Sequence, residues 1–231
     1  MISTRHARFP LCLLLAAFLP ISTAFTGKAP WRVPVAEQRN LQVLPVFPFL
    51  KSKRAEVAVE EVRALKQTIL EEAAGTSNGL KATPQQRDAI SKAINGLAAA
   101  NPTKDITTSE LATGTWDLIY TTTPGASGGK LGPFIGEVQQ EVDIANGLYV
   151  NYVRLGPLTG RLEATWDVVN KSQWKVVFKS IAFLLFGQQV VKNELDQAGL
   201  WTLSYLDDDM RVLTARSLER DTGNVYVLAR A

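Results

Sequence analysis

Few residues able to do chemistry remain once the first 24 positions are set aside. The chain has one cysteine, Cys12, and one histidine, His6, and both lie in a segment with the pattern of a removable leader. If that leader is cleaved, the mature chain has no thiol nucleophile, no histidine base and no zinc site of the common kinds. We therefore expect no catalytic residue, no metal site and no cofactor.

Two polar motifs suggest further chemistry, but neither has the spacing that the chemistry needs. The acids of 207–209 could hold a hard cation, yet consecutive acids in a hairpin point to different sides, so we expect a solvated turn. The segment 125–131 is similar to a phosphate loop, but Pro124 stands where that pattern needs glycine and Leu131 where it needs Ser or Thr. We expect a flexible loop at the mouth of a barrel.

Large aromatic side chains dominate one face of the strands expected in the C-terminal half. Trp201, Leu203 and Tyr205 alternate with Thr202 and Ser204, and this period of two indicates a half-buried strand. Other large residues fall at the same even positions, which predicts a filled hydrophobic core or, as the functional alternative, a cavity lined for an apolar guest. The candidate cavity residues are Tyr120, Val142, Trp166, Phe178, Trp201 and Tyr205.

A second group of residues indicates how the strands close into a barrel. Gly114 and Trp116 open the strand-rich region, and Arg216 lies near its end. We expect Arg216 to lie across the Trp116 ring in a cation–π contact worth ~0.5–2 kcal/mol. That contact would close one end of the barrel.

The elements that position these residues follow from a change in hydrophobic period near residue 111. Before it, apolar residues recur every three to four positions, which predicts helices over 53–74 and 83–101, the second with Thr83 and Gln86 as a capping box. After it the period is two, and we predict strands near 114–122, 137–145, 148–155, 160–169, 173–183, 188–194, 199–206, 210–217 and 224–230. Such sequence-adjacent strands favour a mainly β fold: a lipocalin-like up-and-down antiparallel barrel preceded by two α-helices, with room for one small ligand.

The N-terminal region has the pattern of a two-part targeting leader. Residues 1–24 combine a basic start, a short apolar core and small residues at a cleavage point, which predicts a signal peptide. Residues 25–52 are poor in acids and rich in proline, which indicates a transit-like segment and linker. Together they predict import into a plastid with extra membranes, and an ordinary secreted protein is the alternative. The helical lead-in then spans 53–101 and the barrel 111–231.

Charge and hydropathy exclude two classes of partner. After residue 24 the chain has 23 basic against 22 acidic residues and no basic stripe, so we expect no nucleic acid partner. No apolar run after the leader approaches the ~20 residues that cross a bilayer as a helix. We therefore expect peripheral rather than integral membrane contact.

Several blocks of the chain together resemble one family. They are the end of the second helix at Asn101-Pro102, Leu111–Thr121, Gln139–Asp143 with Asn151, Trp201–Arg211 and Gly223–Leu228. Over roughly residues 55–230 the chain resembles the plastid lipid-associated proteins, or fibrillins, which are similar to lipocalins in fold. It departs from their pattern after Arg216, where Ser217–Thr222 replaces a short glycine-containing turn.

The resemblance, taken with the aromatic sheet face and the leader, gives the leading hypothesis. It implies a non-catalytic plastid protein that binds or organises small hydrophobic molecules (lipid, carotenoid or quinone) at thylakoid or plastoglobule surfaces, or in the stroma. One alternative is a structural or assembly protein with a solid barrel that recruits partners in the plastid. Another is an enzyme acting on an isoprenoid or lipid, with Tyr205 or Glu163 among its active groups.

Overall fold

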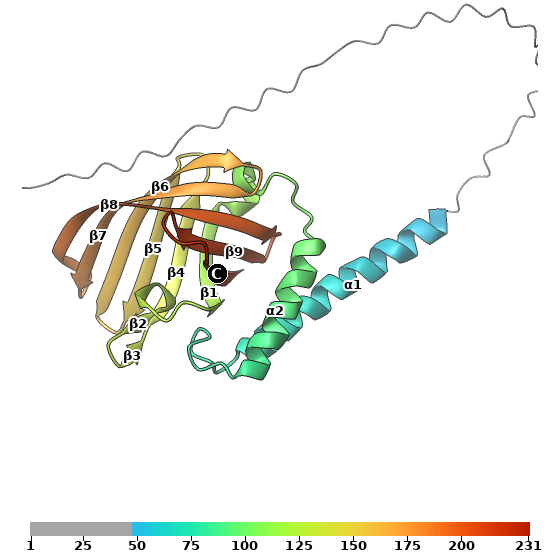
Figure 1. The fold of residues 1–231 in the computed structure, drawn as a ribbon, viewed down its shortest axis with the longest axis horizontal. Helices are drawn as coiled ribbons and strands as arrows, with labels where there is room; N and C mark the ends of the chain where they lie inside the picture. Colours follow the sequence, from blue (N-terminus) through green and yellow to red (C-terminus); the bar gives the residue numbers. More distant parts are fainter. Residues whose placement is uncertain (1–47) are drawn as a thin grey trace, which may run out of the picture. The chain divides into compact units, whose positions relative to one another are not determined.

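The computed structural model describes residues 48–231 and begins with two helices, α1 (Pro48–Ala73) and α2 (Pro84–Ala99) (Figure 1). The predicted signal peptide, and the predicted transit-like segment as far as residue 47, lie outside the described residues. Helix α1 begins at Pro48, inside the stretch expected to be linker. Proline suits the first turn of a helix, where its missing N–H leaves no hydrogen bond unmade.

Helix α2 begins as its sequence predicts. The Thr83 hydroxyl accepts from the Gln86 backbone N–H, and the Gln86 side chain accepts from the Thr83 backbone N–H, at 3.2 and 3.0 Å. This capping box satisfies two donors that a helix start otherwise leaves free. The two helices pack side by side (Figure 1), with Ile69 of α1 and Ile90 and Leu97 of α2 fully buried.

Eight antiparallel strands form a closed barrel in the order β1-β10-β9-β8-β7-β6-β5-β4. Each strand pairs with its neighbour in sequence, and β1 pairs with both β4 and β10, which closes the sheet and confirms the up-and-down barrel. The strands are β1 (Gly114–Thr121), β4 (Glu137–Asp143), β5 (Leu148–Leu155), β6 (Leu158–Asn170), β7 (Gln173–Leu185), β8 (Gln188–Leu206), β9 (Met210–Ser217) and β10 (Asn224–Arg230).

The largest difference from the expected strands is β8. The stretches 188–194 and 199–206 form a single strand, whose pairing with β7 is interrupted by a register shift between Phe178 and Ser180. A bulge of this kind takes up extra residues without ending the strand, so residues 195–198 remain in the sheet. A short hairpin, β2 (Lys130–Leu131) with β3 (Phe134–Ile135), lies in the segment expected to be a loop.

One end of the barrel is covered by the chain that precedes β1. Two short 3-10 turns, η1 (Ile106–Thr108) and η2 (Glu110–Ala112), supply carbonyl groups to buried indoles. The Trp174 indole N–H donates to Thr107 O and the Trp116 indole N–H to Ala112 O, each at 3.0 Å. We call this the closed end; the opposite end, at the β5–β6, β7–β8 and β9–β10 connections, is the open end.

Two hydrophobic clusters share the barrel wall. One fills the interior, and the other lies between the outer wall and the two helices. Register shifts follow Leu118 in β1 and Leu203 in β8, and each inserts a residue that reverses the side-chain alternation. Tyr120 and Tyr205 therefore belong to the helix cluster rather than to the interior, which corrects their expected place in the cavity.

Candidate ligand-binding site

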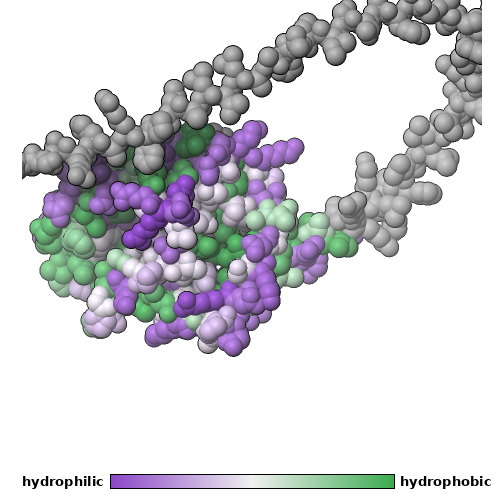
Figure 2. Space-filling view, viewed as in Figure 1, coloured by the Kyte–Doolittle hydropathy of each residue, from purple (hydrophilic) through white to green (hydrophobic). Residues whose placement is uncertain are grey.

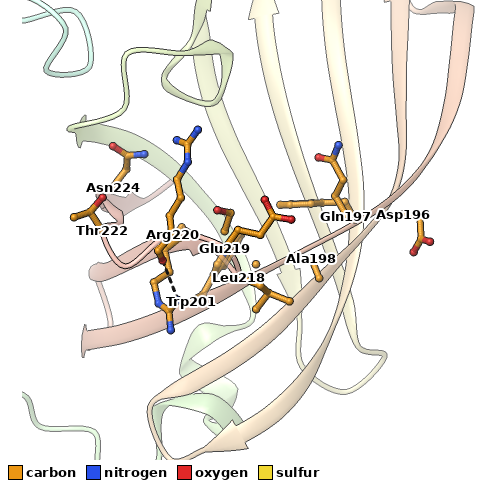
Figure 3. Close-up of a pocket in the computed structure, with 14 residues that line it drawn as sticks. Asp196, Gln197, Ala198, Trp201, Leu218, Glu219, Arg220, Thr222 and Asn224 are labelled. Atoms are coloured by element: carbon orange, nitrogen blue, oxygen red, sulfur yellow. Dashed lines mark hydrogen bonds between the residues drawn. The ribbon is translucent and has the colours of Figure 1, made fainter. Parts of the chain in front are cut away.

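A hollow of about 550 Å³ lies at the open end of the barrel (Figure 3). Its sides are residues 196–199 in the middle of β8 and residues 217–220 of the β9–β10 loop. Its base is formed by Phe178, Trp201 and Ala215. We call this space the outer hollow; its volume is in the range of sites that take a small molecule, ~300–1,000 Å³.

A smaller chamber of about 110 Å³ lies inside the barrel. It shares Phe178, Trp201 and Ala215 with the outer hollow, so the two spaces adjoin at these three residues. The remaining lining residues of this inner chamber are Ser127, Gln140, Tyr149, Asn151, Leu162, Leu213 and Tyr226.

The inner chamber combines aromatic walls with a few polar groups. Tyr149 meets Trp201 edge to face, with ring centres 4.8 Å apart. Gln140 and Asn151 are buried polar side chains on neighbouring strands, and the Tyr226 hydroxyl donates to Ser127 Oγ at 3.1 Å. Burial raises the pKa of the Tyr149 phenol, which stays neutral. Apolar walls with a few polar side chains are typical of small-molecule sites.

Arg211 lies between this chamber and the closed end, and the sequence analysis did not single it out. Its side chain is 0 % exposed, its Nη2 donates to Gln140 Oε1, and its guanidinium carbon lies 5.1 Å from the Trp116 ring centre. Burial lowers its pKa to about 10, so it is still protonated at neutral pH. The signal that could have identified it is a single arginine in the apolar run Met210–Leu213.

Arg230, not Arg216, forms the expected contact with Trp116. The Arg230 guanidinium carbon lies 4.2 Å from the Trp116 ring centre, and its nitrogens donate to the carbonyls of Leu111, Thr113 and Asp208. Arg216 instead lines the outer hollow and donates to Arg220 O at 3.0 Å. The reason is register, because β1 pairs with the last strand and places Trp116 opposite Arg230.

The other candidate residues are divided between the site and its surroundings. Phe178 and Trp201 line both the outer hollow and the inner chamber. Val142 is buried in the interior cluster without lining the chamber, and Trp166 stacks on Trp174 with ring centres 4.8 Å apart. Gly114 has φ +132°, and a Cβ placed there would lie 2.6 Å from Arg230 Nη1, so glycine is required where the barrel closes.

A separate groove of about 420 Å³ lies between α1 and the barrel and is lined in part by Val62 and Tyr205. At its edge the Lys66 ammonium pairs with Asp207 and Asp209, and the Tyr205 hydroxyl donates to Asp207. The expected solvated turn is thus only partly solvated, since the side chains of Lys66 and Asp207 are 16 and 19 % exposed. These contacts fasten α1 to the β8–β9 turn.

Two features are absent from residues 48–231. None of the helices in this part of the chain is both long and apolar enough to cross a membrane. Within the same residues, no three His, Cys, Asp or Glu side chains gather where they could hold a metal ion.

The chain has the architecture of the small eight-stranded up-and-down β-barrels, whose interiors are either filled by side chains or hold one small ligand. The PAP_fibrillin family model matches residues 63–229, from the middle of α1 to the end of the last strand, and the chain belongs to this family. The resemblance seen in the sequence is confirmed. The chain is also similar to the probable plastid-lipid-associated protein 5, chloroplastic, of Arabidopsis thaliana, with 25 % identity over 196 residues that cover 84 % of this chain and 79 % of that protein.

Proposed function

We propose that this protein binds a small hydrophobic or amphiphilic molecule in its barrel and acts as a non-catalytic lipid-binding protein of plastids. The observation that carries the proposal is the outer hollow of about 550 Å³, which shares an aromatic base with the inner chamber. Phe178 and Trp201 offer flat apolar surfaces to a guest, which suit lipids, carotenoids and quinones. The sides of the hollow are largely polar and include Asp196, Glu219 and Arg220, which suit the polar part of an amphiphilic guest.

Exposed apolar residues around the open end support peripheral contact with a lipid surface. Phe186 at the β7–β8 turn, Phe134 in β3 and Leu218 in the β9–β10 loop are 81, 61 and 51 % exposed. Figure 2 shows hydrophobic residues gathered at the left, where the tips of β7 and β8 lie in Figure 1. A ligand leaving a membrane for the barrel would enter by this end, so docking and loading would use one surface.

The proposed plastid location is supported by the relative named above, which is described as chloroplastic. It agrees with the two-part leader predicted from the sequence of residues 1–52. Within the plastid, the exposed apolar residues of the open end favour a thylakoid or plastoglobule surface over free solution.

A titration of the purified full-length chain with decyl-plastoquinone tests this function. Trp201 lies in the shared base, so binding there quenches tryptophan fluorescence in a saturable way. Ala215→Phe places a ring in the shared base and should weaken binding at least 10-fold. The matched control Thr165→Phe adds the same ring to an exposed outer-wall position and should leave binding unchanged. No saturable binding of quinone, carotenoid or galactolipid would contradict the proposal.

A second candidate function is recruitment of protein partners by a barrel that carries no ligand. The groove between α1 and the barrel favours it, since about 420 Å³ of largely apolar space lies beside Val62 and Tyr205. Purification of a stable complex from plastids that contains this protein and partner proteins but no lipid would favour recruitment. Loss of that complex on Val62→Asp, with the fold intact, would assign it to the groove.

A further inference from the structure

The side chains of β9 alternate between the two hydrophobic clusters and place Arg211 inside the barrel. Met210 and Val212 face the helices, whereas Leu213 belongs to the interior cluster and lines the inner chamber. Arg211 shares the interior side with Leu213, and its side chain is fully buried. A permanent positive charge therefore lies inside an otherwise largely apolar barrel.

This charge has no opposite charge among the residues that the structure describes. Its hydrogen-bond acceptor, Gln140 Oε1, is neutral, and its Nε and Nη1 atoms are buried with no hydrogen-bond partner. No described Asp or Glu forms an ion pair with it. Burial is the main cause that lowers the pKa of Arg211, and the second cation, Arg230, lowers it further; the Tyr149 phenol acts in the opposite direction but is itself neutral. A buried ion without a compensating charge strongly destabilises a fold.

Contact with Trp116 does not explain why a cation is placed here. Arg230 already covers the Trp116 ring at 4.2 Å, closer than Arg211 at 5.1 Å, and also ties the barrel's seam together. A cation–π contact is a modest attraction to the face of the ring and leaves the N–H donors of the guanidinium unused. A negatively charged acceptor would pair with the unused Nε and Nη1 donors of Arg211 and compensate its charge.

The sizes of the two spaces fix how such a ligand would be oriented. The inner chamber of about 110 Å³ has the volume of about four waters at ~30 Å³ each, enough for a head group and too little for a lipid. The outer hollow of about 550 Å³ has room for a hydrocarbon chain, which would lie along its apolar residues Phe178, Trp201 and Leu218. Gln140 lines the chamber and contacts Arg211, so it links the guanidinium to the space that a head group would occupy.

We infer that the barrel binds an amphiphilic carboxylate head first, with the carboxylate directed through the inner chamber toward Arg211 and the chain in the outer hollow. A carboxylate is small and planar, and it accepts two parallel N–H bonds from a guanidinium. The inference rests on the proposed function, because it names the head group of the ligand that the barrel holds. It adds an ionic requirement that a carotenoid or quinone does not meet.

The test compares cis-parinaric acid with its methyl ester on the purified full-length chain, using probe fluorescence. We expect the wild type to bind the acid at least 10-fold more tightly than the ester. Arg211→Gln should remove this preference and leave the affinity for the ester unchanged. The control Arg87→Gln, a change at an exposed arginine of α2 that lines neither the outer hollow nor the inner chamber, should retain the preference.

Two results would overturn the inference: equal affinity of the wild type for acid and ester, or a preference that survives Arg211→Gln. Either result would leave the proposed function standing, since both probes would still bind. Failure of both probes, together with decyl-plastoquinone, would instead remove the proposed function as well.

A measurement on the wild type alone decides the matter if Arg211→Gln does not fold. Palmitate labelled with ¹³C at the carboxyl carbon, bound to the full-length chain, should keep the chemical shift of the ionised form to pH values below ~4, where a free carboxyl group is protonating. A bound carboxyl that titrates as it does in water would contradict the inference.

Discussion

Arg230 lies over the face of Trp116, with the guanidinium carbon 4.2 Å from the ring centre, at the point where the first and last strands of the barrel pair. The Arg230 guanidinium also donates to the carbonyls of Leu111 and Thr113, which precede β1, and of Asp208 in the β8–β9 turn. One side chain therefore joins the two ends of the sheet to the segment that covers the closed end. In the Gly114-x-Trp116 motif, Trp116 supplies the ring that Arg230 covers, and Gly114 leaves space for the Arg230 guanidinium.

Replacing this arginine should destabilise the barrel more than replacing the arginine first expected in the role. Arg230→Ala loses the cation–π contact and hydrogen bonds from a charged donor, which together give about 2–4 kcal/mol of unfolding free energy. Arg216→Ala, the matched control, removes a rim contact to Arg220 O and should change stability by less than ~0.5 kcal/mol. Urea unfolding followed by far-UV circular dichroism measures both, and equal losses would contradict the assignment.

Gly114 should be intolerant of a side chain for two separable reasons. Its φ of +132° is unfavourable for other residues, and a Cβ would lie 2.6 Å from Arg230 Nη1. Gly156→Ala is the control for a left-handed backbone without a clash, because Gly156 has φ +55° and open space around it, and it should cost ~1–2 kcal/mol. The φ of Gly114 is less accessible to other residues, so only the part of the excess that depends on Arg230 reports the clash. We expect Gly114→Ala to cost more than Gly156→Ala, and the excess to shrink in an Arg230→Ala background. An unchanged excess in urea unfolding would show that the clash is not with Arg230.

The sequence predicts the bounds of several strands, but it does not predict every side-chain orientation relative to the barrel interior. Alternation and turn residues identify β5, β9 and β10 to the residue, because period two and turn chemistry are local properties. The orientation of Tyr120 and Tyr205 depends on two bulges, and no residue type in either strand marks a bulge. Alternation counted through a bulge gives the wrong face for every residue beyond it.

The same limit applies to the candidate site: local alternation predicts some of its residues, and others depend on strand register. The positions of Phe178 and Trp201 in the site follow from alternation alone. In β8 the register shift comes after Leu203, so Trp201 and Leu203 keep the same interior orientation. The choice between Arg216 and Arg230 needs the register of strand closure, which pairs residues more than a hundred positions apart and leaves no local signal. Arg211 had a local signal, a charge within an apolar run, whose meaning depends on the interior being closed.

The contact between α1 and the β8–β9 turn should make stability depend on pH at both ends of the scale. Burial acts to lower the pKa of Lys66, but its hydrogen bonds to Asp207 and Asp209 outweigh burial, and the pKa is raised. Burial acts to raise the pKa of Asp207, but the hydrogen bond from Lys66 outweighs burial, and the pKa is lowered. A depressed carboxyl pKa gives stability above the unfolded value, ~4, that is lost as pH falls through the folded pKa. A raised lysine pKa gives stability below ~10.4 that is lost as pH rises through the folded pKa.

Asp207→Asn tests this dependence. At pH 7 we expect it to lower the free energy of unfolding by about 1–3 kcal/mol, the range for a hydrogen bond to a charged group. The difference from wild type should shrink as pH falls below ~4, because the wild-type carboxyl is then neutral too. Asp208→Asn is the control, since Asp208 is exposed and its side chain makes no described contact with Lys66. A wild-type advantage that stays constant from pH 7 to pH 3 would contradict the ionic role.

Phe186 should matter for membrane contact and not for the fold. It is 81 % exposed and has φ +51°, a left-handed conformation that costs a residue other than glycine ~1–2 kcal/mol and that asparagine tolerates better. Phe186→Asn should therefore leave the free energy of unfolding unchanged or raise it by up to about 1 kcal/mol. The same change removes an aromatic ring from the open end and should reduce co-sedimentation with digalactosyldiacylglycerol vesicles several-fold.

Leu148→Asn is the control for this prediction. Leu148 is 45 % exposed beside the β4–β5 turn at the closed end, so its replacement should leave vesicle binding unaltered. Equal vesicle binding by wild type and Phe186→Asn, or an equal loss in both variants, would mean that the open end is not the surface that meets lipid.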